Sequence, residues 1–516
     1  MIPDMTPSSL NPVHPVNDTF WDSTPFRPAL ILLLGLVAAQ IIASFHVHFS
    51  NLELHDKMQV LRETGYLIVP NSTVLPRLLE WKEAVLGGLF FTLSLGVFLT
   101  LTSLGAAWFR HRVLPERKSL LLVVVVPWLF LLFALNIGGF SLMATLYVLV
   151  IPPLVYSAAS RWLFRKSSRR LRRLTLFHAL CPLLLALLWT TQMEGSIFGD
   201  VRDYLLLSNS VGTKVNDFYY RYTLYPAEAF KSLDQKLIKT VFLDKIPSRA
   251  VSQALERALL NDDYLSVGQE RAAELVITEK NHELHFQQGG VTVSSAKLHQ
   301  FLPSPAPWLA DFSAKTDRNR LFRKLTFVSL LIGFPLFLYI LVYGLVMLLL
   351  SPFLSSRTSS VVATFFCLSA GVLLFFLLFT WRGAVRDQGQ VAQALQSSDS
   401  KTRVAALKFI DSRGLEITRY PAYRDLLNSS SIAERCWIAK ALGTSRRSES
   451  YKELLSFLDD PYPTVVHATF QALAKRKNPA AIPRILASLE TSTDWYNQWH
   501  AYKALRSLGW KQSMLK

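Results

Sequence analysis

The chain has 516 residues, of which 51% are hydrophobic and only 18% are charged. Soluble domains carry about 25% charged residues, so this composition points to a membrane protein and excludes a largely disordered chain. Its three cysteines, Cys181, Cys367 and Cys436, stand far apart, which excludes a disulfide-stapled scaffold.

The net charge of +18 is concentrated in one part of the chain. Residues 109–173 contain 11 basic residues and one acidic residue, and the basic residues stand in two short loops between apolar runs. A basic chain can bind nucleic acid, but the cytoplasmic loops of membrane proteins also collect lysine and arginine. We favour the second interpretation and expect no nucleic-acid partner.

Seven apolar runs are long enough to cross a hydrocarbon core, which takes about 20 residues. The N-terminal tail, residues 1–27, holds three aspartates against one arginine, whereas a signal peptide begins with positive charge. We therefore expect the first run to be an uncleaved anchor, although Val37-Ala38-Ala39 can be interpreted as a cleavage site. Five runs fall in residues 28–192 and two in residues 325–382. They cover residues 28–45, 84–108, 119–136, 139–158, 174–192, 325–351 and 360–381.

The basic loops predict the topology. Positive loops belong on the cytoplasmic side, which places the N-terminus inside and residues 46–83 and 193–324 outside. Residues 383–516 would then also lie outside, although one miscounted helix would reverse this. We expect an integral protein of a bacterial inner membrane. The second cytoplasmic basic loop carries Arg161, Arg165, Lys166, Arg169, Arg170, Arg172 and Arg173.

The apolar runs contain no Asp, Glu, Lys or Arg, which ion-coupled carriers usually need inside the membrane. His178 and Cys181 share a helix face, but two ligands are a weak signal, and we expect no metal. The chain also lacks the common nucleotide-binding, dinucleotide-binding, hydrolase and zinc-protease motifs. We therefore expect no cofactor, and the question of enzymatic activity stays open, leaning to no.

Residues 193–324 are polar enough to form a small α+β insert outside the membrane. Apolar residues spaced by three and four from Phe230 to Val241 predict a helix after Pro226. A second helix is predicted at about 248–260. Short runs rich in apolar and β-branched residues then predict strands. These runs are residues 275–278, 284–286 and 291–293.

An aromatic cluster stands at the start of this insert. Aromatic side chains near a membrane boundary commonly lie at the level of the headgroups. The cluster could instead bind a sugar, a lipid headgroup or a protein. The acidic residues before it, Glu194, Asp200 and Asp203, look like solvated helix charges. The candidate binding residues of the cluster are Tyr219, Tyr220, Arg221 and Tyr222.

The C-terminal part, residues 383–516, repeats itself at intervals of 31 or 32 residues. A helix pair of this length cannot bury its apolar face alone, so the repeat predicts stacked pairs that form an α-solenoid. The recurring strings are Lys408-Phe409-Ile410, Lys440-Ala441-Leu442, Gln471-Ala472-Leu473 and Lys503-Ala504-Leu505.

This stretch resembles HEAT-like repeats, in particular those of the phycobilisome-lyase type. The resemblance covers the C-terminal part only, implies protein–protein binding on the solenoid surface, and carries over no lyase residue. The last unit is rich in aromatic residues, which form either an end cap or a partner-binding hot spot, where Trp and Tyr are enriched. These candidates are Trp495, Tyr496 and Trp499.

The sequence thus predicts a mainly α protein in which a HEAT-like solenoid is fused to a multi-pass bundle of about seven membrane helices with an α+β insert. We expect a non-catalytic scaffold or assembly subunit whose partners are membrane lipids and other proteins. Two alternatives stay open. One is a membrane enzyme or a lipid- or glycan-handling protein at the bilayer interface, and the other is a transport subunit powered by a separate ATPase.

Overall fold

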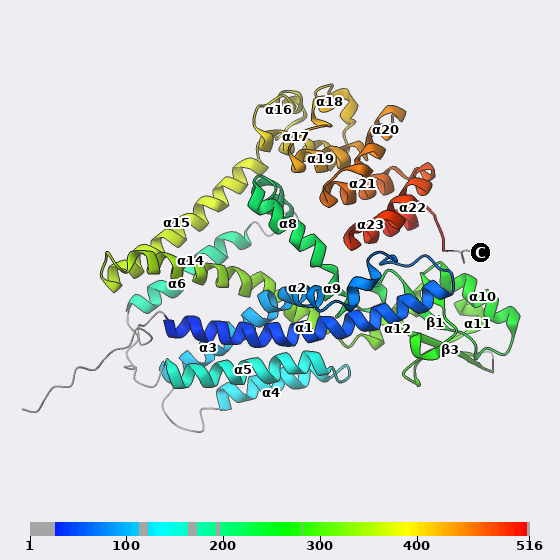
Figure 1. Cartoon of the computed structure of the whole chain (residues 1–516), viewed down its shortest axis with the longest axis horizontal. Coiled ribbons are helices and arrows are strands. Elements are labelled where there is room, and N and C mark those ends of the chain that lie inside the picture. The colour runs from blue at the N-terminus through cyan, green and yellow to red at the C-terminus, as the bar shows by residue number, and fades with distance from the viewer. Residues whose placement is uncertain (1–25, 113–121, 164–172, 192–196, 282, 513–516) are drawn as a thin grey trace, which may run out of the picture.

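The computed structural model describes residues 26–112, 122–163, 173–191, 197–281 and 283–512 (Figure 1). Most of them are helical, and the insert contains one sheet. The N-terminal tail up to residue 25 and Glu194 lie outside the described residues, and so do Arg165, Lys166, Arg169, Arg170 and Arg172 of the basic loop, together with the side chain of Arg173.

Five helical segments are long and apolar enough to cross a membrane. The first extends well beyond the predicted residues 28–45, because no proline or glycine interrupts the chain between Gly35 and Gly65. The five segments are α1 (Phe26–Glu63), α2 with the π-helical turn η3 and α3 (Trp81–Phe91, Thr92–Gly96, Val97–Arg112), α5 (Leu142–Trp162), α13 with the π-helical turn η8 and α14 (Arg320–Val328, Ser329–Gly333, Phe334–Leu350), and α15 (Ser356–Arg382).

Two further apolar helices coincide with predicted runs but are shorter. These are α4 (Leu122–Asn136) and α6 (Arg173–Thr190), whose fully described part spans Leu180–Thr190. A turn around Gly139, whose φ is +122°, joins α4 to α5, between the predicted runs 119–136 and 139–158. The described residues therefore contain five candidate spans, and seven crossings remain a prediction.

The first two spans pack closely because small residues meet between them. A Cβ atom placed on Gly96 would lie 2.4 Å from Cβ of Ala39, so only glycine fits there. The amide of Gln40 is satisfied within the bundle. Its Nε2 donates to the carbonyl of Val85 at 2.8 Å, and its Oε1 accepts from Oγ1 of Thr92 at 2.7 Å. Such internal bonds are what polar groups need at membrane depth.

The insert folds around a five-stranded sheet with the order β2-β1-β3-β4-β5. Strand β1 runs parallel to β2 and β3, whereas β3, β4 and β5 form antiparallel hairpins. The three predicted strands are confirmed, and each is longer than predicted. The strands are β1 (Lys239–Phe242), β2 (Tyr264–Ser266), β3 (Leu275–Lys280), β4 (Glu283–Gln288) and β5 (Val291–Lys297), and the helices are α10 (Arg249–Leu260), α11 (Leu298–Phe301) and α12 (Ala306–Thr316).

The helix predicted from Phe230 to Val241 is wrong. The chain instead forms α9 (Leu224–Glu228), a 3₁₀ turn (Leu233–Gln235) and strand β1. Val241 is fully buried and pairs with Leu275 of β3, so tertiary pairing outweighs the local helical spacing. The second predicted helix is confirmed as α10, and the Ser248 side chain caps its N-terminus.

The C-terminal solenoid stacks helices in two layers. The helices of the inner layer pack on one another in chain order. Asp399, Ser431 and Asp494 cap three of them by accepting backbone N–H groups, and Pro463 opens the fourth. The inner layer is α17 (Ser400–Arg413), α19 (Ile432–Leu442), α21 (Pro463–Arg476) and α23 (Trp495–Ser507). The outer layer is α16 (Val391–Leu395), α18 (Tyr423–Leu426), α20 (Ser448–Ser456) and α22 (Ile482–Thr491).

The solenoid and the insert lie toward one end of the membrane helices (Figure 1). Between the solenoid and the spans runs the docking segment, residues 197–228 (Figure 1). It comprises α7 (Ile197–Val201), the π-helical turn η5 (Arg202–Leu206), α8 (Ser210–Tyr222) and α9. The start of α1, the end of α5 and the turn between α14 and α15 gather at the opposite end.

Candidate functional site at the solenoid junction

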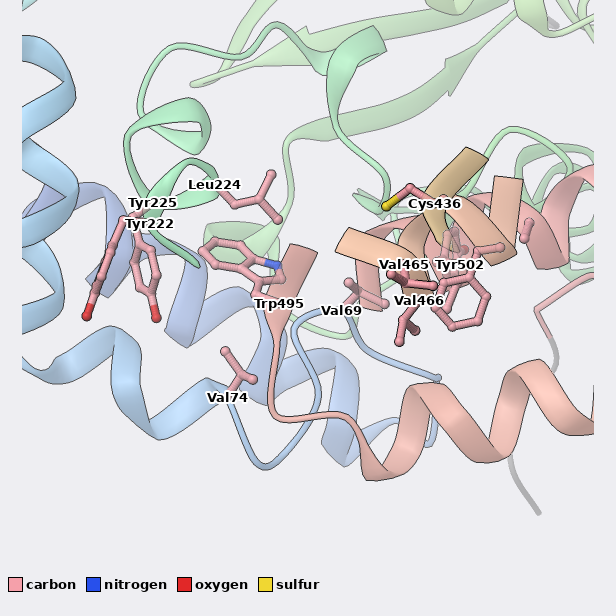
Figure 2. Close-up of a cluster of buried hydrophobic side chains, with 14 of the residues drawn as sticks. Val69, Val74, Tyr222, Leu224, Tyr225, Cys436, Val465, Val466, Trp495 and Tyr502 are labelled. Carbon is pink, nitrogen blue, oxygen red and sulfur yellow. The ribbon is translucent and has the colours of Figure 1, made fainter. Parts of the chain in front are cut away.

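The inner layer of the solenoid rests on the docking segment, on the loop at residues 64–80 and on the insert. The apolar centre of this junction appears in Figure 2, where Trp495 of α23 approaches α9. The indole ring of Trp495 meets the ring of Tyr225 edge-on, with centroids 5.0 Å apart, and only 5% of Trp495 is exposed. This aromatic contact buries the last repeat against α9, which packs on the candidate spans α1 and α2.

A buried ion-pair network joins the first two repeats to the docking segment. Nζ of Lys408 lies 2.7 Å from Oδ1 of Asp200 and 2.9 Å from Oδ2 of Asp203. The indole Nε1 of Trp437 donates to Oδ2 of Asp203 at 2.8 Å, and Nε of Arg202 donates to its Oδ1 at 2.7 Å. Two repeats are therefore tied to one carboxylate.

The expectation that Asp200 and Asp203 are solvated helix charges is wrong. Their exposed fractions are 6% and 3%. Burial alone would raise the pKa of Asp203, but the charges of Arg202 and Lys408 hold it below its ordinary value. Both aspartates lie in the docking segment, and their solenoid partners Lys408 and Trp437 stand more than 200 positions further along the chain.

The two predicted aromatic groups contact each other. The ring of Tyr220 in α8 packs on the ring of Tyr496 in α23 at 4.8 Å and on His467 at 5.1 Å. His467 in turn stacks on His500, with centroids 5.0 Å apart. The rings of Tyr220, Tyr496 and Trp495 are used for internal contacts, and the role of these residues in binding a separate partner stays a prediction.

Burial keeps both histidines neutral. It lowers the pKa of His500 to about 4, and the charges of Lys503 and Lys440 act in the same direction. Burial, together with His500 and Arg202, holds the pKa of His467 well below its ordinary value. The charged groups that lower the two pKa values, Arg202, Lys440 and Lys503, are cationic, and Arg202 is itself paired with Asp203. Protonation of the buried pair would therefore oppose docking.

The loop at residues 64–80 closes the junction on one side. The side-chain amide of Asn71 donates to the carbonyls of Leu489, Glu490 and Ser492, and its backbone N–H donates to Oε1 of Gln498 at 2.9 Å. A single buried asparagine thus satisfies the carbonyl groups at the end of α22.

The insert contacts the last helix of the solenoid. The hydroxyl group of Tyr502 donates to Oδ1 of Asp263 at 2.6 Å, and Nε of Arg506 donates to Oδ2 of the same residue at 3.1 Å. Asp263 stands in a left-handed conformation with φ +59°, in the turn before β2. The solenoid therefore contacts both the docking segment and the insert.

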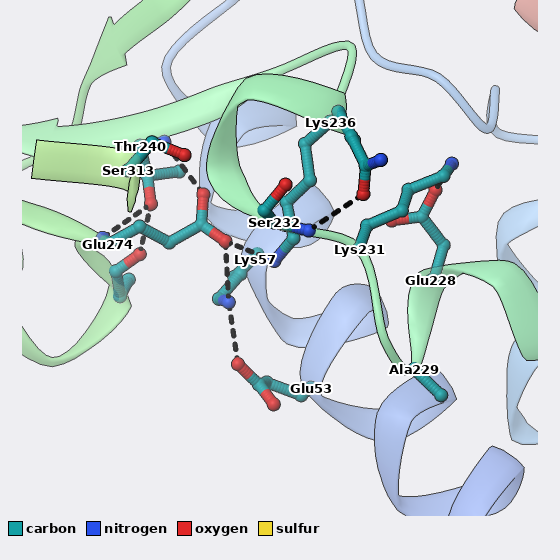
Figure 3. A network of polar contacts seen from close by, with 12 residues as sticks. Glu53, Lys57, Glu228, Ala229, Lys231, Ser232, Lys236, Thr240, Glu274 and Ser313 are labelled. Carbon is teal, nitrogen blue, oxygen red and sulfur yellow. Dashed lines mark hydrogen bonds and ion pairs between the residues drawn. The ribbon is translucent and has the colours of Figure 1, made fainter. Parts of the chain in front are cut away.

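A cavity of about 550 Å³ lies where α1, the insert and α23 meet. Phe49, Trp495 and Trp499 contribute aromatic walls, and the opposite wall is polar. Figure 3 shows the polar network of this wall, which centres on Glu274. Trp499 Nε1 is buried without a hydrogen-bond partner among the described residues.

In the polar wall, acidic and basic side chains pair with one another. Oε1 of Glu274 accepts from Nζ of Lys57 at 3.1 Å and from Nζ of Lys236 at 2.5 Å, and Oε2 accepts from the backbone N–H of Thr240. Lys57 also donates to Glu53 at 2.6 Å. Burial would raise the pKa of Glu274, but the two lysines lower it to about 2.

The cavity lining carries charges of both signs. Besides the two glutamates and two lysines of this network it includes Glu228, Asp317, Lys231, Arg271 and Arg318. Among the described residues, no group of three or more His, Cys, Asp or Glu side chains could hold a metal ion. The cysteines Cys181, Cys367 and Cys436 are unpaired and buried.

The remaining candidate residues are more exposed. Tyr219 is 53% exposed on α8, and Arg221 is exposed beside it, whereas Tyr222 is buried at 8%. Trp499 is half-buried and lines the cavity. Arg161, the described member of the basic loop, is exposed near the end of α5.

Lys408, Asn71 and Asp263 were not among the sequence candidates. A partial signal existed for Lys408, because lysine recurs at this repeat position as Lys440 and Lys503. Residues that recur at one repeat position are expected to lie on the same face of the solenoid. Nothing in the sequence identifies the partners of Asn71 or Asp263.

Residues 420–506 match the family model for HEAT repeats, which confirms the HEAT-like C-terminal part. No curated protein and no solved structure matches the chain. HEAT repeats commonly mediate protein–protein interactions, so the match is consistent with protein partners.

Proposed function

We propose that the protein is a non-catalytic membrane scaffold that recruits protein partners through its solenoid and its insert. The observation that carries this proposal is the docked solenoid itself. Buried ion pairs at Lys408 and the buried ring of Trp495 hold its inner layer against the base. The outer layer stays exposed and is held at a set position over the membrane. We further propose that the repeats are of the short phycobilisome-lyase type, without lyase chemistry.

We also propose that the chain crosses a bacterial inner membrane seven times, with the N-terminus in the cytoplasm and the solenoid outside. The contact of Tyr502 with Asp263 supports one common side for solenoid and insert. Arg110 stands near the end of α3 and Arg161 near the end of α5. Both helices end on the side opposite to the solenoid, where cytoplasmic loops with basic residues are expected (Figure 1).

The outer layer offers a polar surface. Arg424, Lys452 and Arg484 are exposed on three successive outer helices. In the described chain, the strongly exposed large hydrophobic side chains end at Phe379, before the solenoid begins. A polar surface without an exposed apolar patch fits a partner that binds reversibly, since obligate interfaces are more apolar.

Site-specific photo-crosslinking tests this proposal in the native membrane. A photoreactive amino acid is placed in the full chain at Arg424, Lys452 or Arg484. The control position is Phe353, which is 82% exposed in the turn between α14 and α15 at the other end of the spans. We expect one and the same protein to be captured from the outer-layer positions and not from Phe353.

A charge-reversal variant then shows whether the captured protein recognises this surface. With Arg424→Glu, Lys452→Glu and Arg484→Glu combined, capture from a fourth outer-layer position, Gln393, should fall strongly. Glu449 pairs with Arg424 at the surface, and Glu449→Lys serves as a single-site comparison. Unchanged capture from Gln393, or no captured protein at any solenoid position, would argue against the scaffold.

The cavity favours a second candidate, a lipid- or glycan-handling protein at the bilayer interface. Its aromatic and polar walls lie beside the membrane base. Native mass spectrometry of the full chain should then detect a bound small molecule. Trp499→Ala should release it, whereas Trp510→Ala, which alters a Trp outside the cavity lining, should retain it. Absence of any bound mass in the wild type would reject this candidate.

A further inference from the structure

Helix α8 turns one face toward the solenoid. Asn216 and Tyr220, which are four residues apart, lie on this face. The side-chain amide of Asn216 donates to Oγ1 of Thr464 at 3.0 Å, and the ring of Tyr220 packs on Tyr496. These contacts define the solenoid side of α8.

A second face of α8 is apolar and exposed. Its four large side chains follow one another at helical spacing, and Lys214 and Arg221 are exposed beside them. A continuous stripe of this kind marks a contact surface, because single exposed apolar residues are ordinary but contiguous ones are not. The stripe consists of Val211, Val215, Phe218 and Tyr219, with exposed fractions of 70%, 52%, 39% and 53%.

Both ends of α8 are held close to the ends of membrane spans. Before α8, Asp200 pairs with Nε of Arg382, the last residue of α15, at 3.8 Å. After α8, Tyr225 packs on Gly87 in α2, where an added Cβ would lie 2.9 Å from the tyrosine. A helix of 13 residues is about 20 Å long. Because the segments before and after α8 contact the end of α15 and the first part of α2, α8 extends from one of these candidate spans toward the other (Figure 1).

We propose that α8 is a membrane-surface helix whose apolar stripe lies in the headgroup–acyl boundary of the bilayer. The exposed apolar surface of α15 reaches Phe379, and α7, which contacts α15, exposes Phe198 at 63%. The stripe continues this lipid-facing surface. Lys214 and Arg221 stand beside it, where cationic side chains contact anionic headgroups.

Lipid contact would give α8 a role that does not depend on any protein partner. One side of the helix enters the bilayer surface, and another side holds the solenoid through Asn216 and Tyr220. The bilayer therefore supports the solenoid through α8. Such helices bury their apolar face by about 5–10 Å, which is shallow enough to leave the solenoid in water.

Fluorescence quenching in proteoliposomes tests this placement. The full chain carries Val215→Cys, labelled with an environment-sensitive fluorophore through a maleimide. The native cysteines are buried, and mock-labelled wild-type protein sets the background. The matched control is Asp217→Cys, two residues away and so nearly opposite on a helix with 3.6 residues per turn. The vesicles contain phosphatidylethanolamine, phosphatidylglycerol and a lipid with a nitroxide near the top of its acyl chain.

We expect the nitroxide lipid to quench the label at position 215 roughly twofold or more strongly than the label at position 217, because only the stripe enters the acyl boundary. Aqueous iodide should show the reverse order. Equal quenching at the two positions would overturn the proposal. Shielding of position 215 from both quenchers would also overturn it, since that result means that protein covers the stripe.

Discussion

Nζ of Lys408 lies 2.9 Å from Oδ2 of Asp203, and their side chains are 17% and 0% exposed. A buried ion pair contributes little net stability compared with an apolar pair, but breaking it leaves an uncompensated charge. Its main consequence is therefore positional. It determines where the first repeat sits on the segment that follows α6.

Replacing Lys408 with methionine should destabilise the docked solenoid by about 3 kcal/mol, because Asp203 keeps only Arg202 as a cationic partner. Thermal unfolding in detergent measures the change. The matched control is Lys475→Met, whose partner Asp411 lies 2.8 Å away in a pair that is more exposed (49% and 23% of the two side chains), so that a loss below about 1 kcal/mol is expected. Equal losses in the two variants would show that the Lys408 pair does not hold the junction.

Acidification should loosen the junction in a defined pH window. An unfolded histidine has a pKa of about 6.5, whereas that of His500 is about 4. Between these values the unfolded state binds more protons, so stability falls as the pH decreases through this window. The lowered pKa of His467 acts in the same direction.

The double variant His467→Gln, His500→Gln isolates this effect. Its unfolding temperature should change less than that of the wild type between about pH 6.5 and about pH 4, the window set by the histidine values. The carboxylate of Asp203, whose pKa is also lowered, loses its contribution only below about pH 4. Identical pH profiles for the variant and the wild type would contradict a role for the stacked histidines.

Removing the indole ring of Trp495 should open the apolar centre of the junction. Truncation of a buried tryptophan to alanine costs about 3–5 kcal/mol, and the ring is 5% exposed against Tyr225. Limited proteolysis should then cleave the solenoid of Trp495→Ala faster than that of the wild type. Phe353→Ala, at a ring that is 82% exposed in the turn between α14 and α15, should leave the cleavage rate unchanged, and a similar rate for both variants would refute the prediction.

Neutralising Glu274 should destabilise the base of the insert. Glu274→Gln keeps the shape but leaves Lys57 and Lys236 facing each other, and we expect a loss of about 3 kcal/mol. With a pKa of about 2, the native carboxylate contributes at all pH values above its unfolded pKa and loses its contribution as the pH falls from about 4.3 to about 2.

The control for this variant is Glu270→Gln. Glu270 pairs with Lys245 at 2.8 Å, but both side chains are almost half exposed, so a loss below about 1 kcal/mol is expected. Chemical denaturation monitored by tryptophan fluorescence compares the two variants. A larger loss for Glu270→Gln than for Glu274→Gln would contradict the buried network.

The parts of the fold that could be predicted depend on local patterns. The recurrence of similar strings, such as Lys440-Ala441-Leu442 and Lys503-Ala504-Leu505, predicts the stacked helices, because each repeat carries its own apolar face and its own helix-start signal, such as the N-cap Ser431. The strands of the β3–β4–β5 meander follow from composition and from the turns between them. Long apolar runs likewise predict the apolar helices, five of which are long enough to be candidate membrane spans.

The parts that could not be predicted depend on pairing across the chain. Val241 shares its three–four spacing with helices, and only its pairing with β3 makes it part of a strand. From the sequence alone, Asp200 is interpreted as a solvated charge, because its partner Lys408 lies far away in the chain. The junction consists of contacts between residues that are far apart in the chain, so no single segment of the sequence predicts it.

Cysteine accessibility in spheroplasts tests the central claim most directly, namely that solenoid and insert form one docked unit on a single side of the membrane. Lys452→Cys on the outer layer, Val291→Cys on the insert and Arg161→Cys at the end of α5 are each introduced into the full chain, and all three positions are exposed. A membrane-impermeant maleimide should label Lys452→Cys and Val291→Cys at once and Arg161→Cys only after permeabilisation. Labelling of Lys452→Cys and Val291→Cys from opposite sides would contradict the docked arrangement.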